Sequence, residues 1–216
     1  MLPFTRDQFM GIFVEYNAGV WPAQVVAYLV GLIMLAMVVR PSGAGGRIIG
    51  AGLATMWIWT RVVYHSLYFS AINKAALVFG TLVVLQGIRL IFAGVTGRLR
   101  FGARSGASLW LDWAFVVHAS VIYSWVGLWA GHRYPEMPMF GIAPCPVTIF
   151  TFGLVLLATP PVPWWLLVVP FIWPLIGGSA AFLLAVRQDW LLLVSGVAAA
   201  DVVRRKHARR PMTMTA

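Results

Sequence analysis

Hydrophobic residues fill long stretches of the chain, and polar residues are concentrated in the shorter segments between them. A helix needs about 20 apolar residues to cross a bilayer, so stretches near this length predict membrane spans. Seven apolar segments follow one another: 20–39, 48–67, 75–93, 109–130, 147–159, 164–186 and 190–203. The fifth and seventh are short for a span. The pattern predicts an all-α membrane protein, a bundle of about seven transmembrane helices.

Residues 1–19 precede these segments and have the pattern of a short surface helix. Thr5 and Gln8 are spaced as in a capping box, in which two residues cap the first helical turn reciprocally. Phe9 and Tyr16 fall on one face of such a helix, which would place its apolar side in the plane of the membrane interface. We therefore expect an N-terminal interfacial helix.

Charged residues make up 10% of the chain and hydrophobic residues 61%. A soluble domain carries about 25% charged residues, so this chain lacks the polar surface to cover itself in water. The net charge of +10 comes mainly from two short loops and the tail: Arg40, Arg47, Arg98, Arg100, Arg104, Arg204, Arg205, Lys206, Arg209 and Arg210. Such clusters are typical of cytoplasmic segments beside anionic lipid. We expect the N-terminus outside, a transmembrane domain over residues 20–203 and a basic cytoplasmic tail over residues 204–216.

A polar face is predicted near the outer end of the second segment. Four side chains are spaced i, i+3, i+4 and i+7 and would share one face of an α-helix: Arg61, Tyr64, His65 and Tyr68. Polar groups at membrane depth are costly and normally face the bundle interior or a wet cavity. This face would bind a ligand or form structural hydrogen bonds, or Arg61 would extend to the interface.

The outer loop, residues 131–146, places more reactive groups on the same side. It holds His132, Tyr134, Glu136 and Cys145, the only cysteine. Pro146 suits the first turn of the next helix, with Cys145 just before it. Cys145 with His132 or His65 would bind a soft metal ion or pair as nucleophile and base; a rigid, inert corner is the alternative.

Together these groups predict a pocket that faces the extracytoplasmic side. The expected ligand-binding residues are Arg61, Tyr64, His65, Tyr68, Asn73, His132, Tyr134 and Glu136. A metal ion would be held by Cys145, His132 and His65. The residue pattern identifies no catalytic group and no particular cofactor.

Four further polar positions fall inside the predicted spans. We expect Arg89 to form an ion pair with Asp112 or Asp201. His118 would hydrogen-bond to a neighbouring helix, with a proton relay or an axial cofactor ligand as the alternatives.

Several stretches carry a family resemblance: TRDQF, WP, YHSLYFSAINKAA, GHRYPEMPMFG and PCPVTIFTFGLVL. They resemble a bacterial membrane family, domain of unknown function 6064, over nearly the whole chain. The resemblance implies a multi-pass protein of the bacterial inner membrane. It transfers no catalytic residue and no activity.

Three classes of function stay open. The first is binding or passage of a small solute or metal ion through the outer pocket. The second is a structural or assembly subunit, whose partner would be another membrane protein or a second copy of the chain. The third is a membrane-embedded redox or metal-dependent enzyme that uses His118 or Cys145, although a protein without enzymatic activity is favoured. The lipid bilayer is the expected environment, and nucleic acid is excluded because no basic stretch is interleaved with stacking aromatics.

Overall fold

The computed structural model describes residues 2–102, 109–159, 162–184 and 190–208, and these ranges contain helices and loops but no strand. The elements in chain order are α1 (Arg6–Gly19), α2 (Ala23–Val39), α3 (Gly45–Trp59), η1 (Thr60–Tyr68), η2 (Phe69–Ala71), α4 (Ala76–Val95), α5 (Leu109–Val117), η3 (His118–Ile122), α6 (Tyr123–Trp129), α7 (Pro144–Leu157), η4 (Trp164–Leu166), α8 (Val168–Leu183) and α9 (Trp190–Ala208). The all-α prediction is confirmed, and each predicted apolar segment contains helix.

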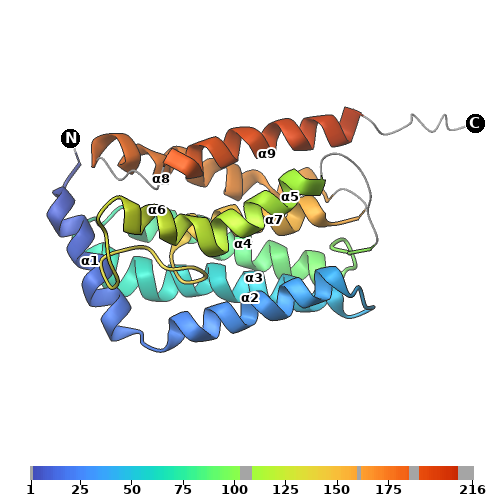
Figure 1. Ribbon diagram of the computed structural model, residues 1–216, viewed down its shortest axis with the longest axis horizontal. Helices are drawn as coiled ribbons and strands as arrows, with labels where there is room; N and C mark the ends of the chain where they lie inside the picture. The colour runs from blue at the N-terminus through green and yellow to red at the C-terminus, as the bar shows by residue number, and fades with distance from the viewer. Residues whose placement is uncertain (1, 103–108, 160–161, 185–189, 209–216) are drawn as a thin grey trace, which may run out of the picture.

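The long helices lie side by side along the bundle, and α1 crosses one end of it (Figure 1). α1 and α2 meet at an angle of 82°. The predicted capping box is confirmed, because the Gln8 N–H donates to Thr5 Oγ1 at 3.2 Å and the Thr5 N–H donates to Gln8 Oε1 at 2.9 Å. Phe9 and Tyr16 belong to the buried face of α1, which packs against the bundle. α1 therefore lies across one end of the bundle, which we call the α1 end.

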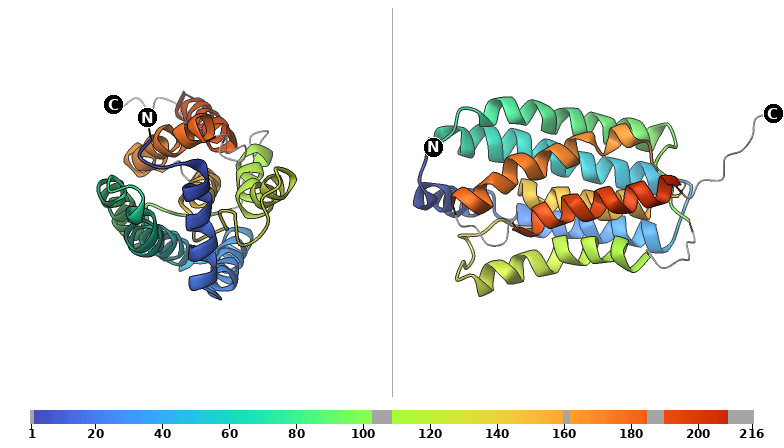
Figure 2. Two further views of the ribbon diagram at one scale, coloured as in Figure 1. Left: turned by 90° about the vertical axis from the view of Figure 1, so that its left-hand side faces the viewer. Right: turned by 90° about the horizontal axis from the view of Figure 1, so that it is seen from above.

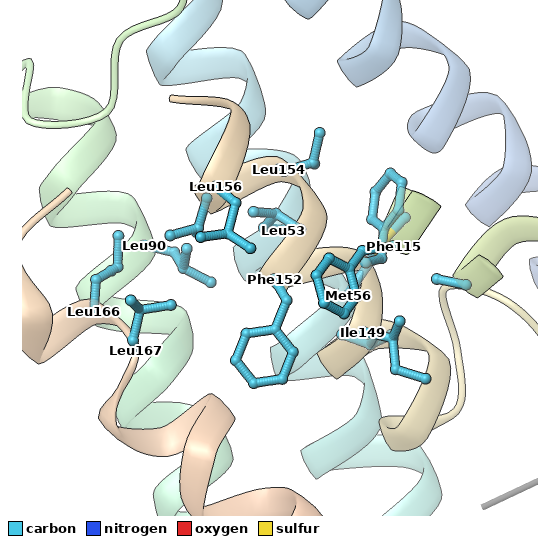
Figure 3. Packing of buried hydrophobic residues seen from close by; sticks show 14 of the residues in the cluster. Leu53, Met56, Leu90, Phe115, Ile149, Phe152, Leu154, Leu156, Leu166 and Leu167 are labelled. Atoms are coloured by element: carbon cyan, nitrogen blue, oxygen red, sulfur yellow. The ribbon is translucent and has the colours of Figure 1, made fainter. Parts of the chain in front are cut away.

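The helix α7 occupies the middle of the bundle (Figure 2). It packs against α3, α5, α8 and α9, and all but one of its 14 residues are buried. Ile149, Phe152 and Leu154 of α7 lie among Leu53 of α3 and Phe115 of α5 (Figure 3). A helix that is hydrophobic all round is expected in such a central position.

The outer faces of the surrounding helices are also apolar. Examples are Leu32 of α2, Val78 of α4, Trp125 of α6, Leu175 of α8 and Val197 of α9, all more than 60% exposed. Within the described residues, two helices are long and apolar enough to cross a bilayer, Ala76–Val95 and Leu109–Trp129, and the bent pair α1 and α2 would add a third. These features are compatible with a membrane protein.

Glycines allow α3 and α4 to approach backbone to backbone. A Cβ added at Gly50 would lie 2.7 Å from the Leu90 carbonyl oxygen, and one added at Gly94 would lie 2.8 Å from the Gly46 carbonyl oxygen. Small residues of this kind are typical of helix contacts in membranes, where close packing replaces hydrophobic driving force.

Arg89 does not form the predicted ion pair in the part of the chain that the structure describes. Arg89 Nη1 donates instead to the Trp165 carbonyl oxygen at 3.3 Å. Asp201 pairs with Arg204 (3.0 Å) and Arg205 (2.6 Å), which lie one turn further along the same helix and reach it without crossing the bundle.

Replacing Gly50 with alanine should weaken the α3–α4 contact. Its new methyl group would meet a backbone oxygen that cannot move without separating the helices, so we expect the free energy of unfolding to fall by about 1–3 kcal/mol. Thermal unfolding of the purified protein measures the loss. Gly11→Ala is the matched control, because Gly11 is also helical and has no atom within 4 Å of an added Cβ. It should raise stability by up to about 1 kcal/mol. Equal effects of the two changes would contradict the close-approach interpretation.

Candidate functional site

A cavity of about 520 Å³ lies at the α1 end, between the start of α1, the η1 segment, the start of α7 and α8. We call it the α1-end cavity. Its wall is largely aromatic: Phe4, Phe9, Phe13, Tyr64, Phe69, Phe79 and Trp173. A second cavity of about 340 Å³ lies between α2 and α3 and has a mainly aliphatic wall that includes Trp59.

The structure brings only part of the predicted pocket together. Four of the predicted residues line the α1-end cavity: Tyr64, His65, Asn73 and Cys145. The other five lie outside its wall: Arg61, Tyr68, His132, Tyr134 and Glu136. The cavity is therefore more apolar than the sequence predicts.

His65 is fully buried and is held by its own helix. Its Nδ1 lies 2.7 Å from the carbonyl oxygen of Thr60, five residues earlier, and Ser66 Oγ donates to the Arg61 carbonyl oxygen over the same interval at 3.0 Å. Both spacings follow the i→i+5 pattern of a π-helix, which is the conformation of η1. The ring of His65 stands edge-on to Trp173, with centroids 5.3 Å apart.

The π-helical register also explains why Arg61 and Tyr68 leave the predicted face. A π-helix turns less per residue than an α-helix, so positions seven apart no longer coincide. Arg61 donates to Ser66 Oγ and lies against Gly80 of α4, where a side chain would have no room. Tyr68 packs on the ring of Tyr16 and covers Gly19. Both side chains contact other parts of the protein in this arrangement and lie outside the cavity wall.

Tyr16 and Asn17, at the end of α1, tie α1 to the outer loop. Asn17 Nδ2 donates to the carbonyl oxygens of Pro135 (2.6 Å) and Met137 (2.8 Å), and Tyr16 Oη donates to that of Ile142 (2.8 Å). Both side chains are completely buried. Burial raises the pKa of Tyr16, which keeps its hydroxyl protonated as a donor.

Further bonds converge on the same two residues. Trp59 Nε1 donates to Tyr16 Oη at 2.7 Å, and the Gln24 amide donates to the Asn17 carbonyl oxygen at 2.9 Å. Tyr134, predicted to bind ligand, donates to the Asn17 carbonyl oxygen at 3.3 Å. The sequence places Tyr16 on the apolar face of the N-terminal helix but gives no signal for the partners of Asn17, which lie 118 and 120 residues away.

The predicted metal trio is not brought together. No three His, Cys, Asp or Glu side chains in the described ranges lie close enough to hold a metal ion. His132 is buried outside the cavity, where its Nε2 lies 3.4 Å from Arg6 Nη2 and its backbone N–H donates to the Gly127 carbonyl oxygen at 2.9 Å. Of the three predicted metal ligands, only His65 and Cys145 line the cavity.

α7 begins two residues earlier than predicted, so Cys145 is its second residue. Pro144 and Pro146 have no N–H, and the Val147 N–H donates to the Ala143 carbonyl oxygen at 3.2 Å. This helix start therefore has little to offer an anion, although helix N-termini commonly bind anions. Cys145 is half-buried in the cavity wall.

These features define a class of protein: a helical bundle with an apolar outer surface and an aromatic cavity lined in part by a crossing helix. The family model described as "Family of unknown function (DUF6064)" matches residues 6–213, and the chain belongs to this family. The match confirms the family resemblance seen in the sequence stretches. No curated protein and no solved structure matches the chain.

Replacing Asn17 with aspartate should loosen the outer loop. Aspartate has the same shape but no N–H, so the carbonyl oxygens of Pro135 and Met137 would lose their donor at a cost of about 1–3 kcal/mol each. Hydrogen exchange of residues 131–143 should rise, and the melting temperature should fall. Asn73→Asp is the matched control, because Asn73 Oδ1 only accepts from the Ala75 N–H (3.1 Å), which aspartate also can. Loop exchange that is unchanged in Asn17→Asp would refute this role.

Acidification should destabilise the α1 end through His132. Burial and the adjacent Arg6 lower the pKa of His132 below its usual 6.5, and Glu136 partly opposes this shift. The unfolded chain therefore takes up the proton at a higher pH than the folded chain. The stability from this group is present above about pH 6.5 and is lost as the pH falls through the folded-state pKa. Melting curves across this pH range should show the loss in the wild type and a smaller one in His132→Gln; superimposable pH profiles would contradict it.

Proposed function

We propose that the protein is a multi-pass inner-membrane protein of about seven spans, with α1 on the outer side, and that it binds a small organic solute in the α1-end cavity. The cavity is the observation that carries this proposal. Its volume of about 520 Å³ falls within the usual range of small-molecule sites, and its wall combines apolar and aromatic side chains with a few polar groups.

The exposed apolar surface supports the membrane part of the proposal. Leu32, Val78, Leu175 and Val197 come from four different helices, so apolar side chains are not confined to one patch. A soluble monomer rarely exposes more than a few hundred Å² of contiguous apolar surface. Lipid chains would cover these faces, with α7 enclosed at the centre and shielded from lipid by its neighbours.

Charge supports the orientation. The α2–α3 turn, the start of the α4–α5 connection and the end of α9 lie at the end opposite α1 (Figures 1 and 2). These segments carry Arg40, Arg47, Arg98, Arg100, Arg204 and Arg205. At the α1 end the cations Arg6, Lys74 and Arg133 are matched by the acids Asp7, Glu15 and Glu136. By the positive-inside rule, this distribution supports an orientation in which the end opposite α1 faces the cytoplasm and the cavity faces the outer side.

The walls favour an organic solute over a metal ion. Aromatic rings dominate the cavity, and the described residues supply no cluster of three metal-binding side chains. Hard and borderline metal ions need several such ligands, whereas rings and methylenes bury the surface of an organic molecule.

Alkylation of Cys145 tests whether the cavity admits a solute. Cys145 is the only cysteine, so N-ethylmaleimide reports on this position alone. Saturating 2-naphthol, a neutral aromatic probe, should slow alkylation about tenfold or more by occupying the space next to the thiol. Ser179→Trp, on the exposed rim, should slow alkylation without probe and abolish the effect of the probe.

Ser42→Trp provides the control. Ser42 is exposed in the turn at the opposite end of the bundle, so tryptophan there should leave both the alkylation rate and its protection unchanged. An alkylation rate that is unchanged by 2-naphthol in the wild type and unchanged by the Ser179→Trp substitution would show that the cavity takes no solute of this kind. That result would overturn the proposed function.

A further inference from the structure

The protonation of His65 is set by its partner. The carbonyl oxygen of Thr60, 2.7 Å from Nδ1, can only accept a hydrogen bond, so Nδ1 carries the ring hydrogen. In the neutral ring Nε2 then presents a lone pair and acts as an acceptor. A group that bonds to His65 Nε2 must therefore bring a hydrogen.

The described part of the chain supplies no such group. His65 is completely buried, lines the α1-end cavity, and its Nε2 has no hydrogen-bond partner among the described residues. Buried polar atoms are nearly always paired, and leaving one unpaired costs about 1–3 kcal/mol. An orphan acceptor on a side chain that lines a ligand-sized cavity points to a donor on the ligand.

An unpaired donor stands beside it. Trp173 is buried, lines the same cavity and meets the ring of His65 edge-on. Its Nε1–H also has no acceptor in the described ranges. Nε1 lies beside Gly177, another wall residue, at 3.1 Å from where a Cβ would stand, so no side chain of that residue covers it. One hydroxyl group can donate to an acceptor and accept from a donor at once.

The wall disfavours a charged ligand. Its side chains come from residues such as Phe79, Pro138, Ile176 and Ser179, and no Lys, Arg, Asp or Glu is among those described as lining it. An ion taken into such surroundings would lose its hydration without gaining a counter-charge. The proline-rich start of α7 gives no compensating set of N–H groups.

Building on the proposed function, we infer that the ligand of the α1-end cavity is an uncharged amphipathic alcohol or phenol, whose hydroxyl donates to His65 Nε2 and whose apolar body lies among the aromatic rings. Trp173 Nε1–H donates to the same hydroxyl oxygen. Ketones and ethers lack the hydrogen that His65 requires, and so do carboxylates. Neither a carboxylate nor a phosphate would meet a counter-charge among the described wall residues.

The test compares 2-naphthol with its methyl ether, 2-methoxynaphthalene, which keeps the ring system and removes the donor. Half-protection of Cys145 against N-ethylmaleimide is measured for each, with free concentrations corrected for uptake by protein-free micelles. Wild-type protein should bind the phenol about tenfold more tightly, the size of one buried hydrogen bond. 2-Acetylnaphthalene, an acceptor only, should match the ether.

Two variants assign the preference to His65. His65→Phe should reduce the phenol-to-ether ratio to about one, and Trp173→Phe, which keeps a ring but removes the N–H, should reduce it in part. His118→Phe is the matched control. His118 is also a π-helical histidine whose Nε2 has no partner among the described residues, but it is not one of the residues that line the cavity. It should leave the ratio unchanged. The wild-type comparison of the three probes needs no variant to fold.

The outcomes separate this inference from the proposed function. Equal, saturable protection by phenol and ether would keep the cavity as a solute site and overturn the hydroxyl inference. A phenol preference that survives in folded His65→Phe would also overturn it. Absence of protection by any of the three probes would overturn both.

Discussion

Burial of α7, complete except at Cys145, is the constraint on which the bundle depends. α7 has the polar side chains of Thr148 and Thr151 in a place that water does not reach, and each donates to a carbonyl oxygen four residues earlier, at 2.8 and 2.7 Å. Trp57 of α3 then donates to Thr151 at 2.9 Å, the kind of interhelical bond that stabilises helix pairs in membranes. The helices around α7 must be apolar towards it and, in a bilayer, apolar outwards as well. The high hydrophobic fraction of the chain is compatible with that double requirement.

At the α1 end the constraint is polar, because the carbonyl groups of a loop lack the hydrogen bonds that a helix would give them. Residues 131–143 run across the end of the bundle, where helical hydrogen bonds no longer satisfy the backbone. Tyr16 and Asn17 supply the missing donors from α1, and Trp59 and Gln24 complete the network. Because unpaired buried carbonyls are costly, these bonds couple the position of α1 to the shape of the loop. Residues of α1 and of this loop both line the α1-end cavity.

Local rules predicted the parts of this fold that depend on neighbouring residues. The capping box of Thr5 and Gln8 and the apolar face of α1 need only α-helical spacing, and both are present. The predicted polar face of Arg61, Tyr64, His65 and Tyr68 assumed the same spacing, but η1 is a π-helix, a register that no simple residue pattern indicates. Of the four residues, Tyr64 and His65 line the cavity. Asn17 was missed because its partners lie about 120 residues away. His65 and Cys145 were predicted in one pocket and do share it, whereas His132, from the same loop motif, is turned towards Arg6.

The π-helical register of η1 also explains how an unpaired acceptor can persist at His65. Bonding of Nδ1 to the carbonyl oxygen of Thr60 fixes the ring and leaves Nε2 without a donor among the described residues. Aromatic packing around it, with Tyr64 at 5.2 Å and Trp173 at 5.3 Å between ring centroids, contributes about 0.5–1.5 kcal/mol per ring pair and offsets much of the cost of the orphan atom. An acceptor that is already unpaired in the free protein can bond to a ligand without first losing a hydrogen bond within the protein. The free energy that the folded chain loses by leaving this acceptor unpaired is therefore regained on binding, so a donor ligand binds more tightly.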